Sequence, residues 1–351
     1  MKTKLFILSF LVLVFGTVNA HVITVSNAPV SGGHFYNLQI AIDSANIGDT
    51  VYCMGSPNSY NSYGESTYND NNIHINNRIT LIGAGYAVTG TQNNWESVLS
   101  GSIILDTGVF TTQLSGTRIL GMDIGSQLYQ NGSGSINSID IERCYFSSYI
   151  YVMGKNWTIF DNTLYLINIQ NNAYAYIENN FLYQVQNSNQ TTVIISNNDF
   201  VISGGDPFAS ISNALIANNI FFYDNPTTSV STSVFTNNLA FNGSAMTLPP
   251  AGNTGSGNIV PASLGVFGFT DITLTSSVGQ NVWIHTWTFK ASSPGYHGGT
   301  DGTDIGVNGG TYAIPNITGA TRIPQMTLLN VPAIVPQGGS MNVNFKARDQ
   351  K

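Results

Sequence analysis

The stretch Ile177-Glu178-Asn179-Asn180-Phe181-Leu182 has an apolar start, a polar group centred on two asparagines, and an apolar end. Five other stretches between residues 141 and 240 repeat this pattern. The first residues of the six stretches follow one another at intervals of 18, 18, 18, 21 and 19 residues. Such a period, without a long helical pattern between copies, is typical of a solenoid in which each repeat forms one coil. The six stretches begin at Ile141, Ile159, Ile177, Ile195, Ile216 and Phe235.

Stacked coils place equivalent residues above one another, so the repeat predicts two asparagine columns. Asparagine tolerates unusual turn conformations, and a column of its amides can hydrogen-bond along the stack. We interpret both columns as structural elements of the fold and not as a binding site. One column contains Asn179, Asn197, Asn218 and Asn237, and the other Asn180, Asn198, Asn219 and Asn238.

The first 20 residues combine a basic start, a short apolar run from Leu5 to Phe15, and the small residue Ala20. This pattern predicts a secretory signal peptide, residues 1–20, that is cleaved after Ala20. The apolar run is too short for a membrane span, and no later segment is apolar enough to provide one. We therefore expect a secreted protein without a membrane span.

Charged residues make up only 8% of the chain, and the formal net charge is −7. Nucleic-acid binding requires clustered basic groups, whereas the 11 Lys and Arg residues are thinly spread. The composition therefore excludes nucleic acid as a partner and leaves an extracellular polysaccharide as a possible one. We expect the protein to be a monomer.

The expected organisation is one β-helix domain at residues 21–315, followed by a C-terminal tail or cap at 316–351. The apolar spacing within Phe35–Asn46 predicts an amphipathic helix, which would cover the open end of the first coil. Earlier coils are less regular, but Arg118–Ile124 is strand-like. Residues 56–72 lack periodicity and predict a long loop.

Two cysteines, Cys53 and Cys144, lie about four coils apart in this organisation. A spacing of about 4.8 Å per coil would separate them by roughly 19 Å. A disulfide needs Cα atoms within about 7 Å of one another. The repeat therefore predicts two buried free thiols, even for an exported protein.

Residues 35–45 followed by Gly48-Asp49-Thr50-Val51-Tyr52 resemble the opening of secreted right-handed parallel β-helix proteins of the pectin-lyase-like group. Leu81-Ile82-Gly83-Ala84-Gly85 is similar to the turn that commonly closes their next coil. The glycine-rich segment 293–310 is similar to the ending of such proteins in environmental bacteria. The resemblance implies an all-β, right-handed parallel β-helix solenoid with an N-terminal capping helix and a short C-terminal β tail. It does not select an activity, because the group includes lyases, hydrolases, epimerases and non-catalytic adhesins.

Polysaccharide lyases of this group need a cation to neutralise a uronate carboxylate and a base for its α-proton. Repeat alignment places Arg143 over Asp161 and Arg118 over Asp140, so cross-coil ion pairs account for both arginines. Lys155, with Glu142 and Asp161 close in coil register, is the remaining catalytic candidate.

The hydrolase alternative needs convergent carboxylates, and the sequence does not identify such a pair. The five histidines have no metal-like or nucleophile–base spacing, so no metal site is predicted. Calcium at Asp301 and Asp304 is an alternative to simple turn capping by these side chains, which we favour. No other cofactor is implied.

Tyrosines at equivalent or neighbouring coil positions suggest sugar stacking, because each ring offers an apolar face and a hydroxyl. The same rings could instead stabilise the sheet by stacking on one another. These tyrosines are Tyr149, Tyr151, Tyr165 and Tyr183.

The sequence thus favours a secreted, non-catalytic β-helix that presents a glycan-binding surface. The alternatives are a polysaccharide lyase or another carbohydrate-active enzyme, and a purely adhesive surface protein.

Overall fold

The structure is a computed structural model. It describes residues 20–28, 33–64, 68, 70–86, 96–108, 113–170, 172–187, 192–201, 206–222, 224–241, 246–270, 286–311, 313, 325–330 and 344–348. The predicted signal peptide, except Ala20, lies outside these residues, as do parts of the predicted 56–72 loop and most of the tail.

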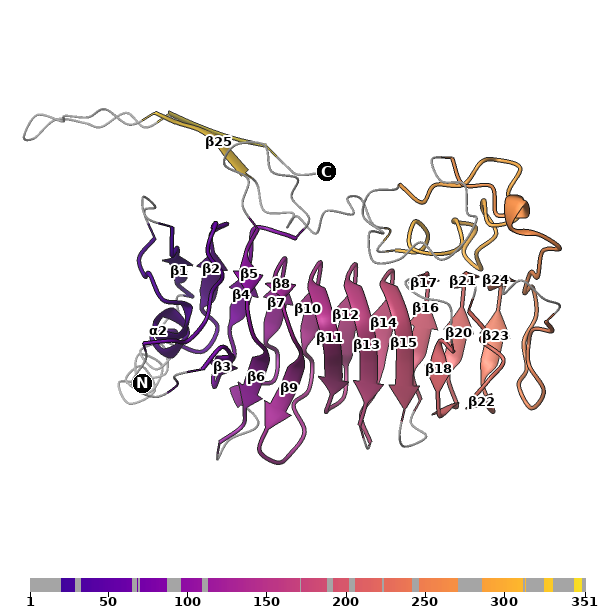
Figure 1. Ribbon diagram of the computed structural model, residues 1–351, viewed down its shortest axis with the longest axis horizontal. Helices are drawn as coiled ribbons and strands as arrows, with labels where there is room; N and C mark the ends of the chain where they lie inside the picture. Colours follow the sequence, from indigo (N-terminus) through magenta and orange to yellow (C-terminus); the bar gives the residue numbers. More distant parts are fainter. Residues whose placement is uncertain are drawn as a thin grey trace, which may run out of the picture.

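The chain winds as a right-handed parallel β-helix, with strands of successive coils side by side along its length (Figure 1). One face is a ten-stranded parallel sheet, here called sheet A. Its strands, in spatial order, are β1 (Val22–Val25), β2 (Thr50–Cys53), β4 (Thr80–Ile82), β7 (Arg118–Leu120), β10 (Asp140–Glu142), β12 (Trp157–Phe160), β14 (Ala175–Glu178), β16 (Ile194–Ser196), β20 (Leu215–Ala217) and β23 (Val234–Thr236).

The second face is a twelve-stranded parallel sheet, here called sheet B. Its main path contains β3 (Ile73–Ile75), β6 (Ile103–Asp106), β9 (Leu128–Asn131), β11 (Tyr145–Val152), β13 (Thr163–Ile169), β15 (Phe181–Asn187), β17 (Asp199–Phe200), β21 (Ile220–Phe222) and β24 (Leu239–Phe241). The short strands β5 (Val98–Leu99), β8 (Asp123–Ile124) and β18 (Phe208–Ala209) pair beside this path, and β19 (Ile211–Ser212) pairs with β22 (Val230–Ser231).

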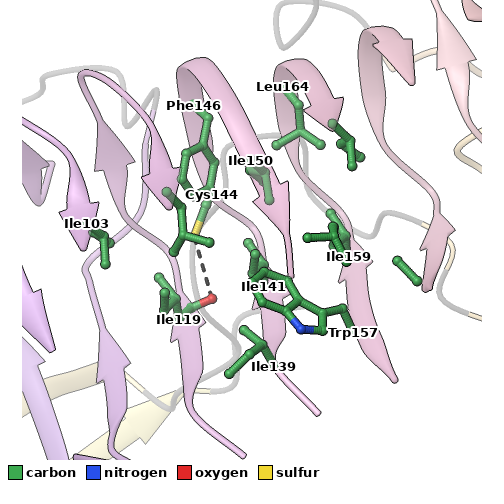
Figure 2. Packing of buried hydrophobic residues seen from close by; sticks show 14 of the residues in the cluster. Ile103, Ile119, Ile139, Ile141, Cys144, Phe146, Ile150, Trp157, Ile159 and Leu164 are labelled. Atoms are coloured by element: carbon green, nitrogen blue, oxygen red, sulfur yellow. Dashed lines mark hydrogen bonds between the residues drawn. The ribbon is translucent and has the colours of Figure 1, made fainter. Parts of the chain in front are cut away.

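The predicted register is confirmed, because equivalent residues of the repeats are direct strand partners. Ile141 pairs with Ile159, Ile159 with Ile177, and the series continues to Phe235. All these side chains are fully buried in one continuous core. Burying each of them stabilises the fold by about 1.5–3 kcal/mol. Figure 2 shows part of this core, with Ile119, Ile141 and Ile159 on successive coils.

The turn from sheet A to sheet B explains why four of the six repeats carry two adjacent asparagines. The first polar position of every turn has a left-handed backbone, with φ between 51° and 59°, which asparagine accepts more readily than most residues. Arg143 and Asp161 occupy this position in the two coils before Asn179. Gly121, with φ 62°, makes the same change of direction one coil earlier, so the predicted single strand Arg118–Ile124 is in fact β7 and β8.

The second asparagine of each turn points inward and forms a buried ladder. Each side-chain amide donates to the side-chain oxygen of the next, at 2.9–3.0 Å. Each side-chain oxygen also accepts the backbone N–H of the preceding rung, at 2.8–3.1 Å. The ladder contains Asn162, Asn180, Asn198, Asn219, Asn238 and Asn258.

Cys144 takes the ladder position in the coil before Asn162. Its thiol donates to the carbonyls of Ile119 and Glu142, as a ladder amide does in later coils (Figure 2). Both Cys144 and Cys53 are free and buried, as predicted. Burial raises the pKa of Cys144 to about 12, so the thiol stays protonated and serves as a donor.

The two ends of the core are covered differently. The only α-helix among the described residues, α2 (Leu38–Asp43), lies at the first coil, where Leu38, Ala41 and Ile42 join the core. It is shorter than predicted at both ends, because Asn37 caps its start and Ser44 its end. At the other end, residues 251–260 form one more coil of polar and small residues over Phe235, held by single bridges to β23 and β24. A Cβ on Gly255 would lie 1.8 Å from the Phe235 carbonyl, so this close approach requires glycine.

The predicted tail strands form a separate antiparallel pair, β25 (Gln325–Asn330) and β26 (Asn344–Arg348). The short 3-10 helix η2 (Leu264–Val266) lies between the last coil and the segment that returns over the solenoid. Within the described residues, no helix is both long and apolar enough to cross a membrane.

We predict that Asn180→Ala lowers the free energy of unfolding by about 3 kcal/mol, because the variant leaves several buried backbone and amide groups without partners. Asn168→Ala is the matched control, since this amide lies on the solvent side of the same sheet pair and should cost less than about 1 kcal/mol. Chemical denaturation measures both values. Equal losses in the two variants would contradict a ladder that holds the coils together.

Candidate functional site

The predicted tyrosines gather on the outer face of sheet B. Tyr149 lies 5.8 Å from Tyr151 and 6.3 Å from Tyr165, measured between ring centroids. Tyr165 stacks on Tyr183 at 5.1 Å, with 23° between the ring planes. These four residues, from here on the tyrosine patch, form one continuous aromatic surface across β11, β13 and β15. All four rings are at least partly exposed, so a planar ligand can contact them.

Neutral amide side chains continue the tyrosine patch across β13 and β15. Tyr151 is the register partner of Asn168, which is the partner of Gln186. Asn168 donates to Gln186 and accepts from Gln170, and Gln186 donates to Gln184. We refer to Asn168, Gln170, Gln184 and Gln186 as the amide network. Because these amides are hydrogen-bonded to one another, the directions of their remaining donors and acceptors are fixed. Such an arrangement suits recognition of hydroxyl and amide groups.

A histidine cluster lies on the same face, nearer the first coil. His74 Nδ1 is 2.6 Å from Asp106 Oδ2, and His74 Nε2 is 3.5 Å from Asp70 Oδ2. Tyr68 stacks on the imidazole at 3.7 Å and donates its hydroxyl to Asp106. The His74 side chain is only 10% exposed. The cluster therefore fastens part of the predicted 56–72 loop to β3 and β6.

The sequence did not reveal this cluster, because stacking of coils brings its members together. His74 and Asp106 are 32 residues apart, a separation unrelated to the repeat period. Only the spacing of Asp70 and His74, four residues apart, was a local signal.

Another acidic residue, Asp123, lies on β8 beside the start of β11. Asp123 is the register partner of both Val98 and Tyr145. Burial raises the pKa of Asp123 to about 6, and the nearby Glu96 carboxylate adds to the effect. A carboxyl group with such a pKa can exchange protons near neutral pH, which general acid–base chemistry requires.

The far end of the same face is covered by the C-terminal cover, which we define as residues 286–310 and which is orange in Figure 1. Its apolar side chains, including Trp287 and Val307, pack on Phe181 and Phe222 in a second hydrophobic cluster. Tyr183 is partly buried against this cluster. The exposed part of the aromatic surface thus ends at the cover.

The first asparagine column holds the cover in place. Asn179 donates to the carbonyls of Val307 and Gly309, and Asn237 donates to that of Gly298. Asn218 exchanges hydrogen bonds with Thr300 through both its amide and its carbonyl oxygen. Both asparagine columns therefore have structural roles, but only the second bonds continuously along the stack.

Asp199 is a buried carboxyl group beneath the cover. Its Oδ1 accepts the backbone N–H of Val307 at 3.1 Å, whereas Oδ2 has no hydrogen-bond partner among the described residues. Its register partners are Phe181 and Ile220, and burial raises the pKa of Asp199 well above its usual value. The sequence contains a signal for this site, since Asp199 is a charged residue between the apolar column neighbours Phe181 and Ile220.

The structure does not bring the predicted catalytic residues together. Glu142 and Asp161 meet through the buried Arg143, whose Nε lies 3.3 and 3.5 Å from their carboxylates. Arg118 pairs with Asp140 at 3.3 Å, so both predicted cross-coil ion pairs are present. Lys155 is exposed before β12, whereas Asp161 follows that strand, so roughly 20 Å of extended chain separates them.

Asp301 and Asp304 cap turns within the cover. Asp301 accepts hydrogen bonds from the backbone and the hydroxyl of Thr303, and Asp304 accepts the backbone N–H of His297. The bond from the Thr303 side chain lowers the pKa of Asp301. Across the residues described, no three or more His, Cys, Asp or Glu side chains are grouped as metal ligands.

Together, the fold and this face define a parallel β-helix protein with an aromatic, amide-lined and acidic outer surface on sheet B. Comparisons of the chain with protein-family models, curated proteins and solved structures find no match.

We predict that stability falls as the pH rises above about 4, because the unfolded Asp199 ionises there while the buried carboxyl stays protonated. The slope from this group is at most about 1.4 kcal/mol per pH unit. Asp199→Asn keeps the acceptor for Val307 and removes the ionisation, so its melting temperature should exceed that of the wild type by a margin that grows as the pH rises above about 4.

The control is Asp301→Asn, for which we expect the opposite dependence of the melting-temperature difference on pH. The pKa of Asp301 is lowered, so its carboxylate favours the folded state above the unfolded pKa and loses that contribution as the pH falls. Parallel melting curves for wild type and Asp199→Asn across the pH range would refute the assignment.

Proposed function

We propose that this chain is an exported β-helix protein that binds polysaccharide on the outer face of sheet B. The observation that carries the proposal is the tyrosine patch, four contiguous tyrosines with the amide network beside them. Aromatic faces stack on the apolar faces of sugar rings, while fixed amides and tyrosine hydroxyls bond to sugar hydroxyls. Export is proposed from the signal-like residues 1–20, and the resemblance to secreted pectin-lyase-like proteins agrees with it.

Two features of the patch favour ligand binding over mere sheet stabilisation. Tyr165 remains 37% exposed although it stacks on Tyr183. Farther along the same column, Phe222 is buried in the second hydrophobic cluster, where its ring contacts Phe267. The phenylalanine of the column is therefore buried, whereas Tyr165 stays exposed and Tyr183 partly so, as expected where the hydroxyls contact a polar ligand.

We predict that Tyr165→Ala and Tyr183→Ala each weaken polysaccharide binding about tenfold, corresponding to the loss of about 1.4 kcal/mol. Affinity electrophoresis in gels containing a panel of polysaccharides measures the effect. Tyr176→Ala is the matched control, since Tyr176 is 39% exposed on sheet A and also lies next to a second tyrosine, Tyr174. Equal losses in all three variants, or no retardation by any polysaccharide, would count against the proposal.

The raised pKa of Asp123 favours a second candidate function, a carbohydrate-active enzyme on the same face. In this alternative Asp123 is the general acid beside Tyr145, and Glu96 is the second carboxylate. Incubation with polysaccharides should then release reducing ends with an optimum near pH 6. Asp123→Asn should abolish the release, whereas Asp140→Asn on sheet A should not. Absence of release from every polymer tested rejects this candidate and leaves the binding function.

A further inference from the structure

The distribution of basic residues around the solenoid is one-sided. Between Val22 and Gly310 the chain contains only five of them. Arg118 lies in sheet A in ion pairs, and Arg143 is buried between carboxylates. Arg78 and Lys155 precede strands of sheet A, and Lys290 belongs to the C-terminal cover. None of the described strands of sheet B contains Lys or Arg.

Two segments that connect to strands of sheet B add no Lys or Arg either. Residues 87–95 and 188–191, which connect to strands of sheet B, contain no charged residue in their sequence. Among the described residues, the strands of sheet B from β3 to β15 therefore carry no positive charge, except when His74 is protonated, and that imidazole is held between two carboxylates.

The charges that this face does carry are negative. Asp106 and Asp123 lie on its strands, and the Asp70 side chain is 44% exposed beside His74. A uronic acid polymer laid on the tyrosine patch would bring carboxylates toward these groups without any partner of opposite sign. Like charges repel one another, and desolvating an unpaired carboxylate adds a further penalty.

The columns of the face also indicate how a polymer would lie. Because Leu128 pairs with Ile150, a single column runs from His74 through Ile104, Tyr129 and Tyr151 to Asn168 and Gln186. Neighbouring strands are about 4.8 Å apart, a spacing similar to the length of one sugar ring. A chain running along the solenoid axis can therefore place successive sugars on successive coils.

We propose that the outer face of sheet B binds an uncharged polysaccharide along the solenoid axis and discriminates against polyuronates. Rings lie on the tyrosine patch, and hydroxyl or acetamido groups bond to the amide network. This inference rests on the proposed binding function and specifies its ligand class.

The test uses pairs of polymers with one backbone and different charge. Hydroxyethylcellulose is compared with carboxymethylcellulose, and highly methyl-esterified pectin with polygalacturonate. Affinity electrophoresis of the full mature chain should show at least tenfold tighter binding to the neutral member of whichever pair is bound. Binding to the neutral polymer should change less than twofold between low and high salt, because no ion pair is involved.

A variant that adds positive charge tests whether the discrimination lies on this face. Gln184→Lys combined with Gln186→Lys should raise the affinity for carboxymethylcellulose relative to that for hydroxyethylcellulose at least fivefold, whereas Thr158→Lys on sheet A should leave this ratio unchanged. Equal or tighter binding of the anionic polymers by the wild type, or no gain in the double variant, overturns this inference while the binding function stands. No binding to any of the four polymers overturns both.

Discussion

The side chain of each ladder asparagine satisfies the backbone of two neighbouring coils at once. It accepts an N–H from the coil before it, donates to carbonyls of the preceding and its own coil, and donates to the next asparagine. A buried amide that makes these bonds costs little, whereas a slip of one residue would leave several polar groups unsatisfied in the core. The ladder therefore fixes the register of the coils at the turn between the two sheets.

Because the register is fixed, the outward residues also form columns, and these columns give the molecule its surface chemistry. The tyrosines of β11, β13 and β15 come together for this reason, as do the amides that follow them. The same stacking brings Arg143 next to Asp161. Taken alone, this contact would suggest a catalytic pair. In this fold a cross-coil ion pair is a structural consequence of register, and burial of the arginine agrees with that role.

The C-terminal cover shows how one repeated residue can serve two purposes. The residues of the first asparagine column have the left-handed backbone that the turn requires, and their side-chain amides remain available to bind another segment. Here they bind a glycine-rich segment, which approaches closely because Gly309 and Gly310 have no Cβ to meet Asn197. The second hydrophobic cluster, to which the cover contributes, buries the phenylalanine part of the aromatic column and so limits the exposed surface to the tyrosines. Fold stability and the extent of the candidate site thus depend on the same turn.

The sequence by itself determined the solenoid, its register, the free thiols, the asparagine columns and the alignment of the tyrosines, because all of these follow from residue spacing in a periodic backbone. Only the tertiary structure decided features that join segments without a common period. Asp70 of a loop meets His74 beside Asp106 of the next coil, the C-terminal cover returns over coils about 100 residues earlier, and Lys155 lies at the opposite end of β12 from Asp161. Spacing specifies neighbours within a repeat and between adjacent repeats, whereas contacts of loops and returning segments depend on side-chain packing in three dimensions.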